Sequence, residues 1–281
     1  MLAALTSLLQ TARQSGYAIG AFNIYNLEGV RAVVRAAEQH TSPVMLQIHP
    51  SALQHGGAPL VALCLEAARV ATVPVAVHLD HSASQSAISN GLAAGMTSIM
   101  ADGSHLSYDQ NVAFTRAMVT IARDRQAGVE AELGRLSGTE DDLTVSEYEA
   151  KLTDPALAAD FVSQTGIDAL AVCIGNVHGH YRNEPHLDFE RLQAIHQAVS
   201  IPLVLHGTSG LPDAMVRQTI ALGVCKFNVN TEVRDAYVGA LRQTLQSSQT
   251  PDLLALMQEA EAAMQRVIAA KLRLFGSTNQ A

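Results

Sequence analysis

Short apolar runs alternate with longer helix-like stretches along most of this chain. About eight runs rich in Val, Ile, Leu and Ala recur, at residues 18–24, 43–48, 74–79, 97–101, 128–133, 169–174, 201–205 and 224–229. The helix-like stretches cover residues 27–39, 58–70, 84–94, 110–127, 155–165, 188–199 and 212–222. This alternation is typical of parallel β/α units, and eight such units can close into a barrel.

The positions of the polar residues help to separate a closed barrel from an open doubly wound sheet. Reactive side chains lie at the carboxyl ends of several strands in a barrel, but they gather near one switch point in an open sheet. Here a polar residue lies at or just past the end of seven different runs: Asn23, Asp80, Asp102, Glu132, His178, His206 and Asn228. The pattern favours a (β/α)8 TIM barrel that forms one domain over residues 1–281, with a C-terminal helical extension at residues 251–274.

Composition narrows the class of protein. No apolar run approaches the roughly 20 residues that span a bilayer, and residues 1–14 lack the features of a secretory signal. The net charge of −8 and the lack of Lys/Arg clusters argue against a nucleic-acid surface. The three cysteines are widely spaced within apolar sequence, which indicates buried thiols in a reducing compartment. We therefore expect a cytoplasmic protein that binds neither nucleic acid nor a membrane.

Three histidines follow apolar runs and could meet at one rim of the barrel. They are His81, His178 and His206, and the last two are each followed by glycine. Three protein ligands and one open position are what a catalytic zinc needs. Asp80 precedes His81 and shares a strand face with His78, so we expect it to point inward and act as a base. Taken alone, each motif also fits an ordinary polar strand end or glycine turn.

Two later segments resemble a phosphate site. The sequence His-Gly-Thr-Ser-Gly (206–210) follows the seventh run, and Asn-Val-Asn-Thr (228–231) follows the eighth. Loops after the last two strands of such barrels commonly bind phosphate through backbone N–H groups and hydroxyls. Long connections at residues 135–153 and 175–187 are expected to be lid or substrate loops. The first contains an acidic cluster at 140–142 that could bring a carboxylate to the substrate on closure.

Taken together and in this order, these motifs resemble the class II, metal-dependent fructose- and tagatose-bisphosphate aldolase family. The matching segments cover nearly the whole chain: residues 21–23, 78–81, 129–134, 138–141, 174–179, 205–210 and 226–232. The resemblance implies an aldehyde-lyase of carbohydrate metabolism. Such an enzyme reversibly cleaves a phosphorylated ketose to dihydroxyacetone phosphate and an aldehyde through a zinc-stabilised enediolate.

The resemblance also assigns roles to individual residues. It implies that His81, His178 and His206 hold Zn²⁺ or another divalent ion, with Asp102 and Glu132 as alternate or supporting ligands. Asp80 is implied to take the hydroxyl proton, and Glu140 on the lid to move the proton at the carbanion carbon. The residues predicted to bind substrate are Asn23, Gly179, Arg182, Gly207, Thr208, Ser209, Asn228, Asn230 and Thr231. A monovalent cation as second cofactor, and a homodimer or homotetramer joined through the C-terminal helix, also agree with the family pattern.

Some positions depart from better-known members. His49 ends the second run where a small hydroxyl residue is usual, Thr208 replaces a smaller residue, and Asn230 stands where Asp or Ala is found. Residues 135–140, 173–179 and 226–234 are more similar to the aldolase-like domains that accompany sugar-acid kinase-like proteins. These departures indicate an acidic or otherwise unusual sugar phosphate.

Three other functions fit parts of the sequence. Lys226 lies on the last run and could form a Schiff base if its amine were desolvated. A non-catalytic sugar-phosphate-binding barrel would keep the metal ligands but lack the carboxylates, whereas Asp80 and Glu140 are both present. A metal hydrolase is the third option, but nothing besides the metal and the carboxylate indicates water as the nucleophile.

Overall fold

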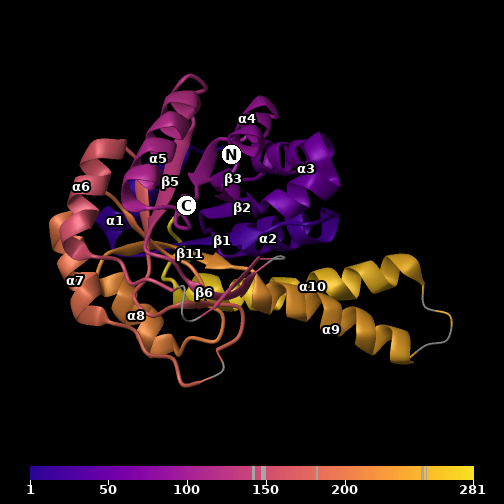
Figure 1. Cartoon of the computed structure of the whole chain (residues 1–281). Coiled ribbons are helices and arrows are strands. Elements are labelled where there is room, and N and C mark those ends of the chain that lie inside the picture. The colour runs from indigo at the N-terminus through magenta and orange to yellow at the C-terminus, as the bar shows by residue number, and fades with distance from the viewer. Residues whose placement is uncertain (141–142, 147–149, 182, 248–249, 251) are drawn as a thin grey trace.

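Eight parallel strands close into a barrel in this computed structural model, which confirms the predicted fold (Figure 1). The structure describes every residue except 141–142, 147–149, 182, 248–249 and 251. Around the barrel the strands follow the order β1, β11, β10, β8, β5, β4, β3 and β2. Their bounds are β1 (Ile19–Asn23), β2 (Val44–Ile48), β3 (Val75–Ser82), β4 (Ser98–Ala101), β5 (Gly128–Leu133), β8 (Ala169–Val172), β10 (Leu203–Leu205) and β11 (Val224–Val229).

Helices surround the barrel, and polar side chains cap several of their amino ends. Asn26 accepts a hydrogen bond from the Gly29 N–H at the start of α2, and Ser107 and Gln110 form a capping box on α5. The helices are α1 (Leu5–Ser15), α2 (Leu27–Gln39), α3 (Pro50–Val70), α4 (Gln85–Ala93), α5 (Tyr108–Arg123), α6 (Pro155–Thr165), α7 (Phe189–Ala198), α8 (Asp213–Ala221), α9 (Thr231–Ser247) and α10 (Leu253–Leu274).

The interior of the barrel changes from apolar to polar along the strands. Near the amino ends of the strands, α1 packs against inward-facing residues such as Ile19, Met45 and Ala76 and closes that end. Two residues further along, the same strand faces carry Gln47 and His78. The buried polar side chains at this level and above it include Asn23, Gln47, His78, Asp80, Glu130, Glu132, Lys226 and Asn228. Buried polar groups need hydrogen-bond or ionic partners, so this layer has to be a connected network.

The structure differs from the sequence prediction in four segments. The expected lid loop contains β6 (Ser137–Glu140) and β7 (Leu143–Val145), and the next long loop contains β9 (Val177–His178); together they form a small sheet. Helix α3 begins at Pro50 rather than residue 58 and is kinked at Gly57, where φ is 57°. The C-terminal extension is a hairpin of α9 and α10, which projects from the barrel (Figure 1). Strand β9 pairs with β6 from a distant part of the chain, whereas β6 and β7 form a local antiparallel hairpin within the segment expected to be a loop.

Among the described residues, no helix combines the length and apolar character needed to cross a membrane.

Candidate metal centre

Three histidine rings converge at the carboxyl ends of the strands, as the sequence predicts. The ring centroids of His81 and His178 are 5.0 Å apart, those of His81 and His206 are 4.5 Å apart, and those of His178 and His206 are 6.0 Å apart. One nitrogen from each ring lies within 4.8 Å of the other two. His180, in contrast, is exposed and lies 3.1 Å from Asp235 on α9, so it takes no part in the cluster.

Carboxylates orient two of these rings. Asp102 Oδ2 lies 2.8 Å from Nδ1 of His81, and Glu130 Oε1 lies 2.9 Å from Nε2 of His206. A carboxylate accepts hydrogen bonds, so these pairs place protons on Nδ1 of His81 and Nε2 of His206. The opposite nitrogens, Nε2 of His81 and Nδ1 of His206, are buried and have no hydrogen-bond partner among the described residues. Buried ring nitrogens left in this state, with His178 beside them, fit a divalent metal ion.

The two acidic residues predicted as further ligands lie next to this cluster. His81, Asp102 and Glu132 form a second group with ligand atoms within 4.8 Å. Asp102 is already engaged, since its Oδ1 accepts from the Ser104 N–H at 3.0 Å while its Oδ2 faces His81. Glu132 Oε2 lies 3.8 Å from Nδ1 of His206. Asp102 is therefore placed to orient His81, and Glu132 is placed to approach an ion held by the histidines.

Three amide N–H groups surround the carboxylate of Asp80, which is fully buried. Its Oδ1 accepts from Nδ2 of Asn228 at 3.0 Å, and its Oδ2 accepts from Nδ2 of Asn23 at 2.9 Å and from Nε2 of Gln47 at 3.2 Å. Gln47 also donates to Oδ1 of Asn23 at 2.7 Å, which fixes the orientation of that amide. The network presents an oriented carboxylate beside His81.

The electrostatics of the site follow from burial and neighbouring charge. Burial alone would raise the pKa of Asp80, but the cations of His81 and Lys226 outweigh it and hold this pKa below its usual value. Burial lowers the pKa of His81, yet the carboxylates of Asp80 and Asp102 raise it well above the ordinary value. Burial, with the charges of His81 and Lys226, lowers the pKa of His206. At neutral pH Asp80 is therefore ionised and His206 neutral, as a base and a metal ligand require.

The residues of the predicted phosphate site lie on neighbouring loops after β10 and β11. Thr208 Oγ1 donates to the backbone oxygen of Asn228 at 2.9 Å and joins the loop after β10 to the end of β11. Gly207 has a φ of 61°, and a Cβ atom there would lie 2.2 Å from the Val177 oxygen, so only glycine fits. Thr231 is the first residue of α9, whose amino end carries backbone N–H groups suited to an anion. Asn23, Thr208, Ser209, Asn228, Asn230 and Thr231 are all buried.

A cavity of about 330 Å³ opens beside the histidines. Its lining includes His81, His178, Glu132, His105 and Arg135. Glu140 ends β6, which pairs in parallel with β9, the strand that carries His178. The side chain of Glu140 and the whole of Arg182 lie outside the described residues, and Gly179 directly follows His178.

The sequence analysis missed two members of this network. Glu130 lies two residues before Glu132, and Gln47 ends the β2 face that begins with Met45, so strand alternation could have identified both as inward-facing. Lys226, considered above as a Schiff-base amine, is fully buried, and its Nζ lies 2.9 Å from Oε2 of Glu130. His49, a departure from the family pattern, has its Nδ1 2.8 Å from Oγ of Ser51 at the start of α3.

Comparisons with known proteins agree with this geometry. The family model for class-II fructose-bisphosphate aldolase matches residues 3–280. A Coccidioides immitis protein with a proposed fructose-1,6-bisphosphate aldolase activity is 36% identical with a TM-score of 0.92, over 98% of this chain and 97% of that chain. The YdjI aldolase of Escherichia coli K12 is 36% identical with a TM-score of 0.90, over 100% of both chains. The fructose-bisphosphate aldolase of Campylobacter jejuni, 21% identical over 100% of this chain and 97% of that chain, shares the fold with a TM-score of 0.81.

The family match covers nearly the whole sequence, and the structure brings together histidines and carboxylates that could hold a metal. The chain therefore belongs to the class-II fructose-bisphosphate aldolase family and is a metal-dependent aldolase, a carbon–carbon lyase.

Proposed function

We propose that this enzyme reversibly cleaves a phosphorylated ketose to dihydroxyacetone phosphate and an aldehyde, with Zn²⁺ held by His81, His178 and His206. The observation that carries the proposal is the placement of Asp80, a buried carboxylate held by amides, directly before a histidine of the cluster. Bound Zn²⁺ would act as a Lewis acid and stabilise the negative charge that develops when the carbon–carbon bond breaks.

In the cleavage direction, Asp80 takes the proton of the substrate hydroxyl next to the bond that breaks. Its depressed pKa keeps it ionised before the reaction, and the N–H donors from Asn23, Gln47 and Asn228 hold its two oxygens in place. The electron pair of the broken bond passes to the dihydroxyacetone phosphate half. Glu140, on β6 beside the strand of His178, then returns a proton to that carbon.

The phosphate of the dihydroxyacetone half binds between the loops after β10 and β11. Gly207, Ser209 and Thr231 supply backbone N–H groups and hydroxyls there, close to the amino end of α9. The family pattern also assigns Arg182, which lies outside the described residues, to this phosphate, and a monovalent cation would assist phosphate binding.

The aldehyde half of the substrate faces the cavity lined by His105 and Arg135. A basic side chain at this position supports an aldehyde that carries a carboxylate or phosphate, in agreement with the departures at Asn230 and His49. A panel of aldehydes offered with dihydroxyacetone phosphate tests the substrate class. Fructose and tagatose bisphosphates as clearly the best substrates would contradict an acidic sugar phosphate.

The Schiff-base alternative has no support in the geometry. The ammonium group of Lys226 donates to Oδ1 of Asn228 at 2.6 Å and is paired with Glu130, with no exposed surface. Treatment with borohydride and substrate tests this alternative, since a trapped adduct would reveal an imine. Loss of activity with a chelator and recovery with Zn²⁺ tests the metal-dependent reaction.

We further propose that two copies of the chain associate through the α9–α10 hairpin. Near its tip, Leu245, Leu253 and Leu254 are 54%, 68% and 62% exposed. At its base, Glu261 of α10 pairs with Arg31 and Arg35 of α2 at 2.8 and 2.6 Å. Exposed leucines on a projecting arm favour contact with another protein surface.

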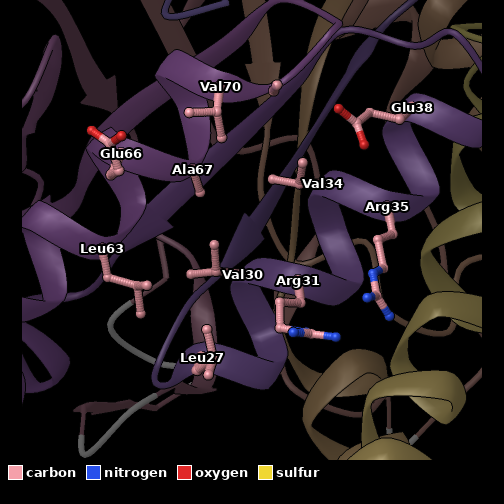
Figure 2. A pocket seen from close by; sticks show the side chains of 11 residues that line it. Leu27, Val30, Arg31, Val34, Arg35, Glu38, Leu63, Glu66, Ala67 and Val70 are labelled. Carbon is pink, nitrogen blue, oxygen red and sulfur yellow. The ribbon is translucent and has the colours of Figure 1, made fainter.

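A groove beside this arm offers a matching surface. Figure 2 shows its lining, in which Leu27, Val30 and Val34 of α2 face Leu63, Ala67 and Val70 of α3. Arg31 and Arg35 form the edge of the groove toward α10. The α9–α10 hairpin and the groove lie on opposite sides of α2. A two-fold axis would therefore let each copy place its exposed leucines on the groove of the other copy. We propose a homodimer of this kind, and a homotetramer would be a pair of such dimers.

A further inference from the structure

Lys226 links two parts of the site that have no direct bond to each other. It is fully buried on β11, and its Nζ lies 2.9 Å from Oε2 of Glu130 on β5. The same Nζ donates to Oδ1 of Asn228, two residues along the strand, at 2.6 Å. Each of these partners contacts a different functional group. Glu130 Oε1 lies 2.9 Å from Nε2 of His206, and Nδ2 of Asn228 donates to Asp80 at 3.0 Å.

The contact with Asn228 decides which way its amide points. An amide can present either its oxygen or its NH₂ group to a neighbour, and the surrounding hydrogen bonds select one orientation. Lysine can only donate, so it holds Oδ1 of Asn228 and turns the NH₂ group toward Asp80. Without this donor the amide can rotate, and its oxygen would then face the carboxylate oxygen of Asp80. The orientation of the proposed base therefore depends on the lysine.

The contact with Lys226 holds the carboxylate of Glu130 in place inside the barrel, with Nζ 2.9 Å from Oε2. Glu130 has no exposed surface, and an ionised carboxylate in such a place needs a nearby cation. Oε1 of the carboxylate held in this way lies 2.9 Å from Nε2 of His206 and accepts from it, which leaves Nδ1 of that ring directed toward the histidine cluster. A carboxylate that accepts a hydrogen bond from the other nitrogen of a metal-binding histidine sets the tautomer and the basicity of that ring.

We propose that Lys226 is a positioning residue that orients both the metal ligand His206, through Glu130, and the base Asp80, through Asn228. The inference rests on the proposed function, because it needs a metal at the histidines and proton transfer at Asp80. Lys226 itself touches neither metal nor substrate in this assignment.

Two variants distinguish the contact of Lys226 with Glu130 from its contact with Asn228. Lys226→Met removes the charge and the donor with little change in size, and it leaves Glu130 unpaired. Lys226→Met with Glu130→Gln removes both charges, so that no unpaired buried charge remains, and the glutamine oxygen can still accept from Nε2 of His206. In neither variant does Asn228 have its donor.

The test measures Zn²⁺ affinity, by competition with a chromophoric chelator, and kcat for cleavage. We expect Lys226→Met to bind Zn²⁺ about 10- to 100-fold more weakly, the range seen when such outer partners are removed. We expect the double variant to recover most of that affinity but to keep a kcat at least about tenfold below the unchanged enzyme, because Asp80 stays misoriented. Arg123→Met, which removes a surface ion pair with Asp168 at the other end of the barrel, is the control.

The outcomes are distinct. If the protein without substitutions binds no Zn²⁺ and cleaves no phosphorylated ketose, the proposed function is overturned and this inference with it. An active, metal-binding parent whose Lys226→Met variant keeps both Zn²⁺ affinity and kcat within twofold overturns the role of Lys226 alone. If Lys226→Met does not fold, the double variant decides, and full kcat in that variant overturns the link to Asp80.

Discussion

Oδ2 of Asp102 lies 2.8 Å from Nδ1 of His81, so the carboxylate fixes both the proton position and the direction of the ring. Asp102 sits just after β4, and His81 near the end of β3, where its φ is 37°. We expect Asp102→Ala to weaken Zn²⁺ binding by about 10- to 100-fold. Equilibrium dialysis with metal analysis checks this. Asp160→Ala, which removes a carboxylate on the outer surface, is the matched control and should bind as the parent does.

Metal binding should depend on pH through His81. The carboxylates of Asp80 and Asp102 raise the pKa of this ring well above its ordinary value despite burial, so the metal-free protein carries a proton there at pH 7. Zn²⁺ must displace that proton, and its affinity should fall up to about tenfold for each pH unit of acidification. Calorimetry in buffers with different ionisation heats measures the protons released. Asp80→Asn removes one of the charges that raise the pKa of His81, so Zn²⁺ binding to this variant should release fewer protons. A Zn²⁺ affinity that does not change between pH 6 and pH 8 would contradict the assignment.

Asp80→Asn should remove most of the activity but keep the metal. Asparagine has the same shape but cannot accept a proton, and general base catalysis is worth about 10²- to 10⁴-fold in rate. We expect kcat to fall by that factor while the Zn²⁺ content stays at one per chain. Turnover coupled to dihydroxyacetone phosphate reduction provides the measurement. An Asp80→Asn enzyme with parental kcat would favour a non-catalytic binding barrel.

Gly207→Ala tests the phosphate loop. The φ of 61° and the nearby Val177 oxygen make any side chain costly, by on the order of 1–3 kcal/mol. We expect a weaker affinity for dihydroxyacetone phosphate, a less stable protein, or both, measured by KM and urea unfolding. Gly239→Ala is the control, because nothing lies near a Cβ atom at that position on α9. It should raise the free energy of unfolding by up to about 1 kcal/mol.

Replacing Leu253 and Leu254 with glutamate should separate the proposed dimer into monomers. Both side chains are exposed near the hairpin tip, and a charge there would have to be desolvated on the apolar groove of Figure 2. Light scattering after size exclusion gives the mass in solution. Glutamate at Val70, on the groove, should have the same effect, whereas glutamate at Leu157 on α6 should not. A parent protein that is a monomer at all concentrations would end the proposal.

Much of this molecule could be predicted from residue order alone. Eight apolar runs separated by helical stretches gave the barrel, because the alternation of strand and helix is local. Successive side chains of β3 point alternately into and out of the barrel, which predicted that His78 and Asp80 point inward. The three histidines were predicted to lie together because each follows an apolar run at the carboxyl end of a strand. The family motifs supplied the reaction, which the whole-chain family match then supported.

Only the tertiary structure decided which groups pair inside the barrel. Glu130 and Lys226 are separated by almost 100 residues, and no local pattern predicts that their side chains meet next to the histidine cluster. The same holds for β6, which pairs with β9 across a long stretch of chain, and for Gln47, which reaches Asn23 and Asp80 from another strand. Strand periodicity determines which face a side chain takes. Its partner depends on barrel closure and register, which bring distant strands together.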